Sequence, residues 1–103
     1  MCVEAFYGWD GVTGQIRQEL RDGVAVLLLD RPVANALSPD LRVELAAALE
    51  RTATAAEVRA VVLAGSGAGF SSGVDLTEYD GPLAEPWIDT LCTRIEEFPK
   101  PVI

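Results

Sequence analysis

The stretch Asp22-Gly-Val-Ala-Val-Leu-Leu-Leu-Asp-Arg-Pro32 decides most of the fold. Its first two residues separate two strand-like runs, at residues 16–20 and 24–29. Because glycine adopts positive φ without strain, an Asp-Gly pair at this place is typical of a β-hairpin. The second run is apolar throughout, which predicts a strand buried on both faces. Pro32 has no N–H for a ladder hydrogen bond, so we expect the chain to leave the sheet there.

Helix and strand signals continue beyond this hairpin. Ser38 followed by Pro39 is a typical helix start, with serine at the N-cap and proline in the first turn. Apolar residues on one face extend the predicted helix to about residue 51 or 52. The segment 52–57 is either a loop or a short helical piece, and residues 58–64 predict a second core strand.

A second helix is predicted over residues 84–98, followed by the opening of another strand at residues 100–103. Trp87, Leu91 and Ile95 recur at helical spacing and are interpreted as core residues. Cys92 is interpreted as a small hydrophobe of the same apolar face rather than a nucleophile, because no histidine accompanies it. The order of the predicted elements indicates layered α/β packing.

Composition bounds the class of protein. Half of the 103 residues are hydrophobic, which excludes a disordered tail and suffices for one small core. We expect residues 1–14, which show no periodic pattern, to be a flexible lead before the N-terminal part of one domain at residues 15–103. The net charge of −8 argues against nucleic-acid and anionic-membrane partners. No run is long enough to span a membrane and no cleavable signal is visible, so the cytoplasm is the expected compartment.

Several kinds of chemistry are excluded by residue type. The sequence contains no histidine, which removes histidine-centred triads and histidine metal sites. Its two cysteines show no CxxC spacing, so we expect reduced thiols and no metal site. Gly65-Ser-Gly-Ala-Gly69 follows a predicted strand, but it lacks the later glycine of a dinucleotide-binding loop and the lysine of a nucleotide phosphate loop. This segment is interpreted as a connecting loop.

The segment Phe70-Ser-Ser-Gly-Val-Asp-Leu76 is the main candidate for a functional role. If a helix begins near Val74, its first N–H groups have no partner within the helix and lie at the positive end of the helix dipole. Such N–H groups suit an oxyanion, because they are fixed in advance and need no charge. In the structural alternative, Ser71 or Ser72 only caps the helix.

Five motifs stand in one order along the chain. They are Leu29-Asp-Arg-Pro32, Asn35-Ala-Leu-Ser38, Val58-Arg-Ala-Val-Val-Leu-Ala-Gly65, Phe70-Ser-Ser-Gly-Val-Asp-Leu76 and Pro99-Lys-Pro-Val-Ile103. With them, residues 16–103 resemble the N-terminal part of the enoyl-CoA hydratase/isomerase (crotonase) family. The resemblance implies an α/β fold, a crotonase-like ββα spiral of which this chain is the N-terminal portion only. It also implies acyl-CoA substrates, homo-oligomers (trimers or hexamers) at full length, and no cofactor other than the coenzyme A of the substrate.

The resemblance assigns roles to particular positions. The backbone N–H of Val74 matches the first of two donors in the family's oxyanion hole. The matching coenzyme A contacts are Ala34, Ala36, Ser72, Gly73, Val74, Asp75 and Leu76. Asn35 is interpreted as a turn-former rather than a catalyst, and Asp75 as a loop brace. Many relatives carry a basic residue near position 33 or 34, where this chain is apolar, so phosphate recognition is left to Arg31, to backbone groups or to other regions.

The family's second oxyanion donor and its catalytic carboxylates come after the Pro99–Ile103 motif. The resemblance therefore implies the N-terminal part of an enoyl-CoA hydratase/isomerase that is inactive alone. Two alternatives stay open. One is a non-catalytic truncated module that binds acyl-CoA or associates with a partner, and the other is an α/β domain whose Gly-rich loop is only structural.

Overall fold

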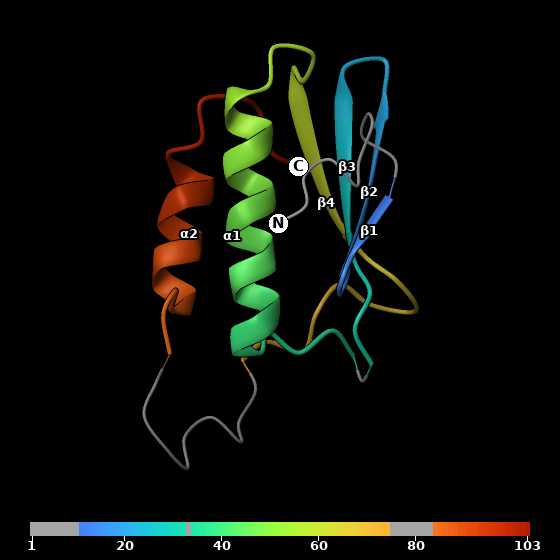
Figure 1. The fold of residues 1–103 in the computed structure, drawn as a ribbon. Helices are drawn as coiled ribbons and strands as arrows, with labels where there is room; N and C mark the ends of the chain where they lie inside the picture. Colours follow the sequence, from blue (N-terminus) through green and yellow to red (C-terminus); the bar gives the residue numbers. More distant parts are fainter. Residues whose placement is uncertain (1–10, 33, 75–83) are drawn as a thin grey trace.

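A four-stranded sheet and two helices make up the part of the chain that the computed structural model describes, residues 11–32, 34–74 and 84–103. The strands are β1 (Gly11–Thr13), β2 (Ile16–Arg21), β3 (Val24–Leu29) and β4 (Ala60–Gly65), and the helices are α1 (Pro39–Thr54) and α2 (Ile88–Glu96). The sheet order is β1-β2-β3-β4, and only β3 and β4 run parallel. Helix α1 connects these two strands and lies between the sheet and α2 (Figure 1).

The β2–β3 hairpin forms where the Asp-Gly pair predicts it. Arg21 pairs with Val24, so the turn has two residues, Asp22 and Gly23. Both have positive φ, 51° and 85°, as a tight hairpin turn with the right twist requires. This turn sets the register, and the register decides which strand residues face α1.

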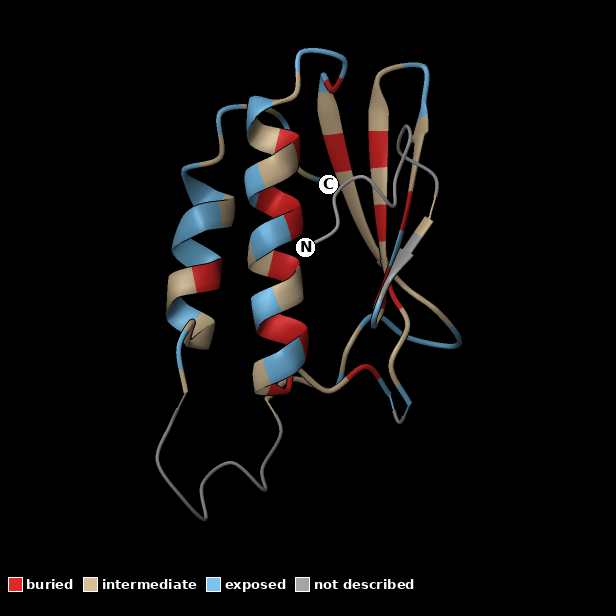
Figure 2. Ribbon diagram, in the orientation of Figure 1, coloured by how far each residue is buried: buried red, intermediate tan, exposed pale blue. Residues whose placement is uncertain are grey.

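The core lies between the sheet and α1. Alternate residues of β3 (Ala25, Leu27 and Leu29) are fully buried. The apolar stripe of α1 faces them, as Figure 2 shows in red, and its residues are Leu41, Leu45, Ala48 and Leu49. The other β3 residues are half-buried, because both described helices cover the same face of the sheet. The prediction that β3 is buried on both faces is therefore wrong for the described residues.

Helix α1 begins as the sequence predicts. The Ser38 side chain accepts a hydrogen bond from the Leu41 N–H at 3.2 Å, and Pro39 occupies the first turn. The helix continues to Thr54, a little beyond the predicted end. There the Lys100 Nζ donates to the carbonyls of Thr52 and Ala55, both at 2.7 Å, which satisfies groups that the helix end leaves open.

Helix α2 is shorter than predicted. It spans Ile88–Glu96 rather than 84–98, because the carbonyls of Ala84 and Pro86 accept hydrogen bonds from the Arg42 side chain instead of from helix N–H groups. Leu91 is buried against α1, whereas Cys92, one residue further round the helix, is exposed. The interpretation of Cys92 as part of the apolar face is therefore wrong.

Both ends of the described chain join the sheet. The Val61 N–H donates to the Pro101 carbonyl and the Ile103 N–H donates to the Val61 carbonyl, each at 2.9 Å. The predicted opening of a strand is thus present as a single parallel bridge between Val102 and Val61. At the other end, Gly11–Thr13 pairs with β2, so the predicted flexible lead is wrong for these three residues. Residues 1–10 lie outside the described residues. Neither described helix is long and apolar enough to cross a membrane.

Candidate functional site

The loops that follow β3 and β4 meet at one edge of the sheet. The two strands are parallel and in register, with Leu29 beside Gly65, so both chains leave the sheet at the same level. Open sheets of this kind bind ligands outside the carboxyl ends of their strands. The loop after β3 carries the described residues 30–32 and 34–38, and the loop after β4 carries residues 66–74. Both contain positions that the sequence analysis singles out.

Asn35 joins these loops. Its side chain is buried and its Nδ2 donates to the carbonyls of Phe70 at 3.0 Å and Ser66 at 3.3 Å. Its Oδ1 accepts from the Arg31 N–H at 2.8 Å. With φ of 53°, Asn35 occupies the left-handed region that asparagine tolerates. The interpretation as a turn-former is confirmed, but the cross-loop hydrogen bonds are an additional role that the sequence analysis missed.

Ser71 and Ser72 fasten the second loop to the first. The Ser72 N–H donates to the Ala34 carbonyl at 2.9 Å, and the Ser71 Oγ donates to the Asn35 carbonyl at 2.7 Å. The same Oγ accepts from the Gly73 N–H at 3.0 Å. Ser71 thus braces a turn between the two loops. Whether Ser71 or Ser72 caps a helix stays a prediction. The predicted helix after Val74 falls on residues 75–83, outside the described residues.

The Val74 N–H is directed away from the first loop. The Leu37 N–H donates to the Gly73 carbonyl at 2.7 Å, so this carbonyl is aimed at the first loop. In a planar trans peptide, the C=O of one residue and the N–H of the next are antiparallel. The Gly73–Val74 peptide is trans, so the Val74 N–H is aimed the opposite way. Within the part of the chain that the structure describes, no atom accepts a hydrogen bond from it.

A cavity of about 340 Å³ lies between the loops. Its walls are Ala34, Ser66, Gly67, Ala68, Gly69, Ser71 and Ser72. The Gly-rich segment, interpreted from sequence as a connecting loop, therefore forms one wall of the cavity. Ala34 and Ser72, two of the predicted coenzyme A contacts, line the same cavity. A side chain at Gly65 would collide with the Phe70 carbonyl oxygen, so glycine is required there.

The remaining predicted contacts are placed differently. Ala36, Gly73 and Val74 do not line this cavity, although they belong to the same two loops. The Ala36 carbonyl accepts from Arg31 Nη1 at 3.3 Å, so the Arg31 side chain is held against its own loop. Asp75 and Leu76 lie outside the described residues.

Arg42 is a buried residue of this region that the sequence analysis missed. Its side chain is fully buried, and among the described residues its guanidinium donates to the backbone carbonyls of Leu37, Ala84 and Pro86. It also lies 4.9 Å from the ring centre of Trp87, a cation–π distance. Position 42 follows Ser38 by four residues on the buried side of α1, so helical spacing could have indicated a buried charge.

The first loop also carries a charged network at its base. Asp30 Oδ2 pairs with Arg17 Nε at 2.8 Å, and Asp30 Oδ1 accepts from the Ser66 Oγ at 3.0 Å. The Arg17 hydrogen bond, followed by that from Ser66, lowers the pKa of Asp30 below its usual range. Asp30 therefore remains a carboxylate that fixes the start of the Gly-rich segment.

Outside this network, on helix α1, burial lowers the pKa of the Arg51 guanidinium.

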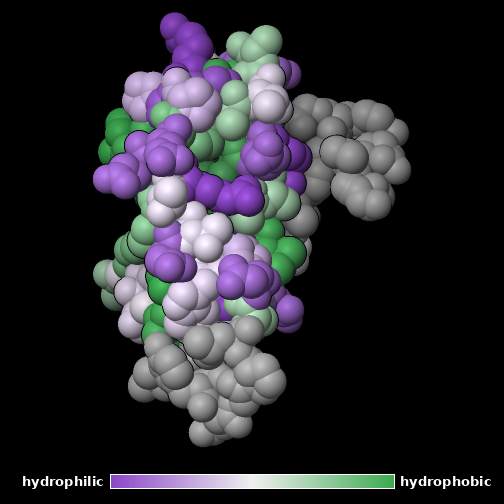
Figure 3. Space-filling model, turned by 90° about the vertical axis from the view of Figure 1, so that its left-hand side faces the viewer, coloured by the Kyte–Doolittle hydropathy of each residue, from purple (hydrophilic) through white to green (hydrophobic). Residues whose placement is uncertain are grey.

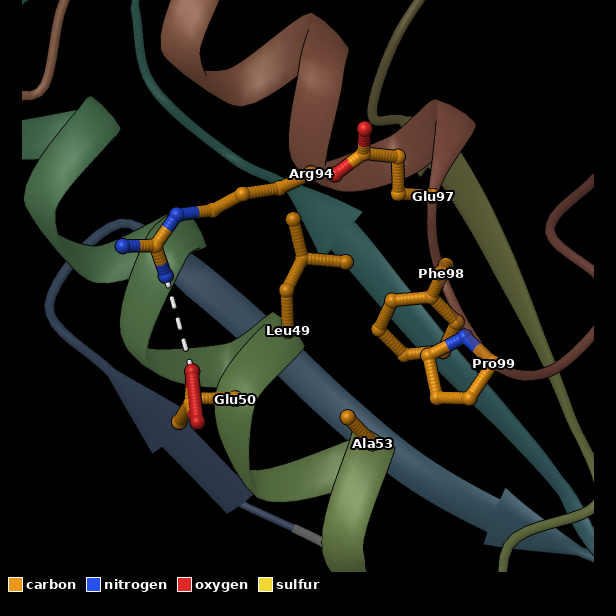
Figure 4. Close-up of a pocket in the computed structure, with 7 residues that line it drawn as sticks. All are labelled: Leu49, Glu50, Ala53, Arg94, Glu97, Phe98 and Pro99. Atoms are coloured by element: carbon orange, nitrogen blue, oxygen red, sulfur yellow. Dashed lines mark ion pairs between the residues drawn. The ribbon is translucent and has the colours of Figure 1, made fainter.

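A second cavity, of about 280 Å³, lies between α1 and α2 (Figure 4). Leu49, Ala53, Phe98 and Pro99 form its apolar part. Glu50 and Arg94 form an ion pair at 3.5 Å across its edge. The face of the molecule that carries α2 is mostly hydrophilic, with smaller hydrophobic areas (Figure 3). This cavity is a gap in helix packing near the end of α1, remote from the two loops.

Comparisons with known proteins identify the family to which the chain is similar. The sequence profile described as enoyl-CoA hydratase/isomerase matches residues 19–103. A probable enoyl-CoA hydratase of Bacillus subtilis is 40% identical over 87 residues, which are 78% of this chain and 34% of the relative. A probable enoyl-CoA hydratase of Rhodobacter capsulatus is 55% identical over 62 residues, 59% of this chain and 23% of the relative.

A solved structure shows the same likeness in three dimensions. An enoyl-CoA hydratase of Mycobacterium marinum superimposes with a TM-score of 0.76 and 32% identity, over 85% of this chain and 46% of that one. The likeness confirms the predicted crotonase-like α/β fold, which corresponds to the N-terminal part of such chains. The chain belongs to the enoyl-CoA hydratase/isomerase family. It spans about a third or less of the length of the two curated relatives.

Proposed function

We propose that this chain forms part of the acyl-CoA site of an enoyl-CoA hydratase/isomerase, in which the Val74 N–H stabilises negative charge on the thioester oxygen. One observation carries the proposal: the bond from Leu37 to the Gly73 carbonyl directs the Val74 N–H away from the first loop. Family membership supports an acyl-CoA substrate.

The chemistry needs a fixed donor at this place. When water adds to C3 of a 2-enoyl thioester, the electron pair of the double bond shifts toward the carbonyl, and charge develops on its oxygen. A main-chain N–H that already faces the oxygen lowers the barrier, because it need not reorganise as the charge appears. The same stabilisation serves a double-bond shift, which passes through a similar enolate.

Coenzyme A is proposed to bind beside this donor as part of the substrate, with no separate cofactor. Its contacts would be the backbone of Ala34, Ala36, Ser72 and Gly73, together with Asp75 and Leu76. Ala34 and Ser72 support this because they line the cavity between the loops. A homo-oligomer of the trimer or hexamer type belongs to the same proposal as a family expectation. A cytoplasmic location belongs to it as the compartment expected from the sequence.

Proton transfer is proposed to depend on groups other than those around the cavity. Among the described residues that line it, none carries a carboxylate. Each absent general acid or base costs about 10²–10⁴-fold in rate, so the 103-residue chain is expected to hydrate crotonyl-CoA far more slowly than a median enzyme, about 10 s⁻¹. Turnover near that rate would contradict this part of the proposal.

Binding gives the direct test. The ¹⁵N-labelled chain would be titrated with acetoacetyl-CoA, whose enolate places negative charge on an oxygen, and in parallel with free coenzyme A. We expect both ligands to shift the amide signals of the cavity loops. Only the thioester should move the Val74 amide proton strongly downfield, because only it supplies the oxygen. An unchanged Val74 signal at saturation, or no binding of either ligand, would refute the proposal.

A further inference from the structure

We propose that Arg42 is the positioning residue that fixes the direction of the Val74 N–H. The inference rests on the proposed function, since it assigns a role toward the same oxyanion donor. Arg42 itself touches neither the Val74 amide nor the cavity. It acts through the backbone of Leu37, the residue that bridges the two loops.

Both polar backbone groups of Leu37 are held. Its carbonyl accepts from Arg42 Nη1 at 2.7 Å, and its N–H donates to the Gly73 carbonyl at 2.7 Å. A charge-assisted hydrogen bond of this length is stronger than one between neutral groups. Rotation of the Leu37 backbone would therefore break two short bonds at once. The guanidinium thus holds the Leu37 carbonyl in place, and the Leu37 N–H in turn holds the Gly73–Val74 peptide.

Gly73 makes such an anchor necessary. Its φ is +99°, in a region that glycine adopts without steric strain and that it exchanges readily for other conformations. A glycine imposes no preference of its own on the orientation of the peptide that follows. The peptide plane must therefore be fixed from outside, and the bridge to Leu37 is the contact that does so among the described residues.

Arg42 also holds the chain on the far side of residues 75–83. Its Nε donates to the Pro86 carbonyl at 2.6 Å, its Nη2 donates to the Ala84 carbonyl at 2.8 Å, and its charge faces the Trp87 ring. One fully buried side chain thus ties the segment before Val74 to the segment before α2. Three carbonyls in a fixed fork suit arginine and not lysine, whose ammonium is a single point of charge.

The experiment compares Arg42→Lys and Arg42→Met with the native chain. The matched control is Lys100→Met, which removes a cation from two backbone carbonyls at the opposite end of the same helix. Two quantities are measured in each protein. The first is the hydrogen-exchange rate of the Leu37 amide without ligand, and the second is the ratio of the dissociation constants for coenzyme A and acetoacetyl-CoA.

We expect Arg42→Met to speed Leu37 exchange at least tenfold more than Lys100→Met does, and to lower the ratio of dissociation constants about tenfold, because small displacements of a donor are costly. Arg42→Lys should show the same changes to a smaller extent, and it replaces the methionine variant if that variant does not fold. Affinity for free coenzyme A should stay within about twofold in the Arg42 variants, since Arg42 is not part of the cavity.

Native Leu37 exchange and a native ratio in a folded Arg42 variant would overturn the inference. The two proposals fail in different ways. A native chain with no preference for the thioester refutes the oxyanion role of Val74, and with it the purpose assigned to Arg42. A native preference that survives in both Arg42 variants refutes the positioning role alone. Equal losses in the Arg42 variants and in Lys100→Met would reduce Arg42 to a structural residue.

Discussion

The two cavities have similar volumes but differ in the residues that line them. The cavity between the loops, about 340 Å³, is lined by small residues whose backbone groups are tied by a hydrogen-bond network. The cavity between α1 and α2, about 280 Å³, is lined mainly by apolar side chains and by long charged side chains at its edge. Volume does not separate a site from a packing gap here. Under the proposed function, the distinguishing feature is a backbone direction that is fixed before any ligand arrives.

The largest effect is expected at Val74, where a substitution can remove the donor itself. Val74→Pro deletes the N–H, and Val74→Ile is the matched control that keeps it. Removing one oxyanion donor typically costs about 10²–10³-fold in rate. We expect the preference for acetoacetyl-CoA over coenzyme A to fall by at least tenfold in the proline variant, by calorimetric titration.

Circular dichroism and coenzyme A binding serve as controls for the fold in both Val74 variants. An isoleucine variant that loses as much preference as the proline variant would mean that the side chain, rather than the amide, faces the ligand. If the proline variant and the native chain show the same preference for acetoacetyl-CoA over coenzyme A, the Val74 amide does not face the ligand and the loop cavity is no better a candidate site than the packing gap.

The next effect is expected at Asn35, because its buried amide donates to two carbonyls of the other loop. Asn35→Ala removes the hydrogen bonds to the Phe70 and Ser66 carbonyls, each worth about 0.5–1.5 kcal/mol, and it places alanine at positive φ. Asn35→Gly removes the same bonds without the backbone strain. We expect urea unfolding to lose about 2–4 kcal/mol for alanine and less for glycine.

The order of the two Asn35 variants carries the information. If alanine and glycine lose the same free energy of unfolding, backbone strain contributes nothing and the hydrogen bonds account for the whole effect. A loss below about 0.5 kcal/mol in both variants would contradict the network that distinguishes the loop cavity.

At the other cavity, substitutions should have small effects. Glu50→Gln breaks the ion pair with Arg94. The Glu50 side chain is 71% exposed and the Arg94 side chain 46%, and exposed ion pairs stabilise little, so we expect a change of about 0–1 kcal/mol in unfolding free energy. Thioester binding should be unchanged, since α1 separates this cavity from the loops. A binding change larger than about threefold would show that the packing gap communicates with the site.

Local signals predicted much of the fold. The Asp22-Gly23 turn and the Ser38-Pro39 helix start act through neighbours in sequence, so residue type alone determines them. The boundary of α2 was predicted wrongly, because Arg42, more than 40 residues earlier, takes the carbonyls that would extend the helix. Solvation of the outer sheet face likewise depends on which elements pack there, which periodicity does not reveal.

The candidate site divides in the same way. The position of Val74 came from motif resemblance, and the cavity contacts of Ala34 and Ser72 followed from it. The wall formed by the Gly-rich segment was missed, because its shape depends on bonds from Asn35 to residues 31 and 35 positions away. Arg42 was missed because a charged residue is normally assigned to the solvent face of a helix.

The smallest effect is expected at Asp30, at the base of the loop network. Arg17 and Ser66 hold the pKa of the folded-state carboxyl below 3.8, the ordinary value. The folded state therefore favours the charged form, and this stabilisation is present above the unfolded-state pKa and is lost as pH falls through the folded-state pKa.

Asp30→Asn keeps an oxygen for Ser66 but removes the charge. Comparing urea midpoints at about pH 6 and about pH 3 isolates this carboxyl, since the other acidic groups titrate in both proteins. The native chain should have the higher midpoint at about pH 6, and the difference should shrink toward about pH 3. A difference that stays constant over this range would show that the Arg17 and Ser66 contacts do not depend on the charge, and would leave the loop network to its neutral hydrogen bonds.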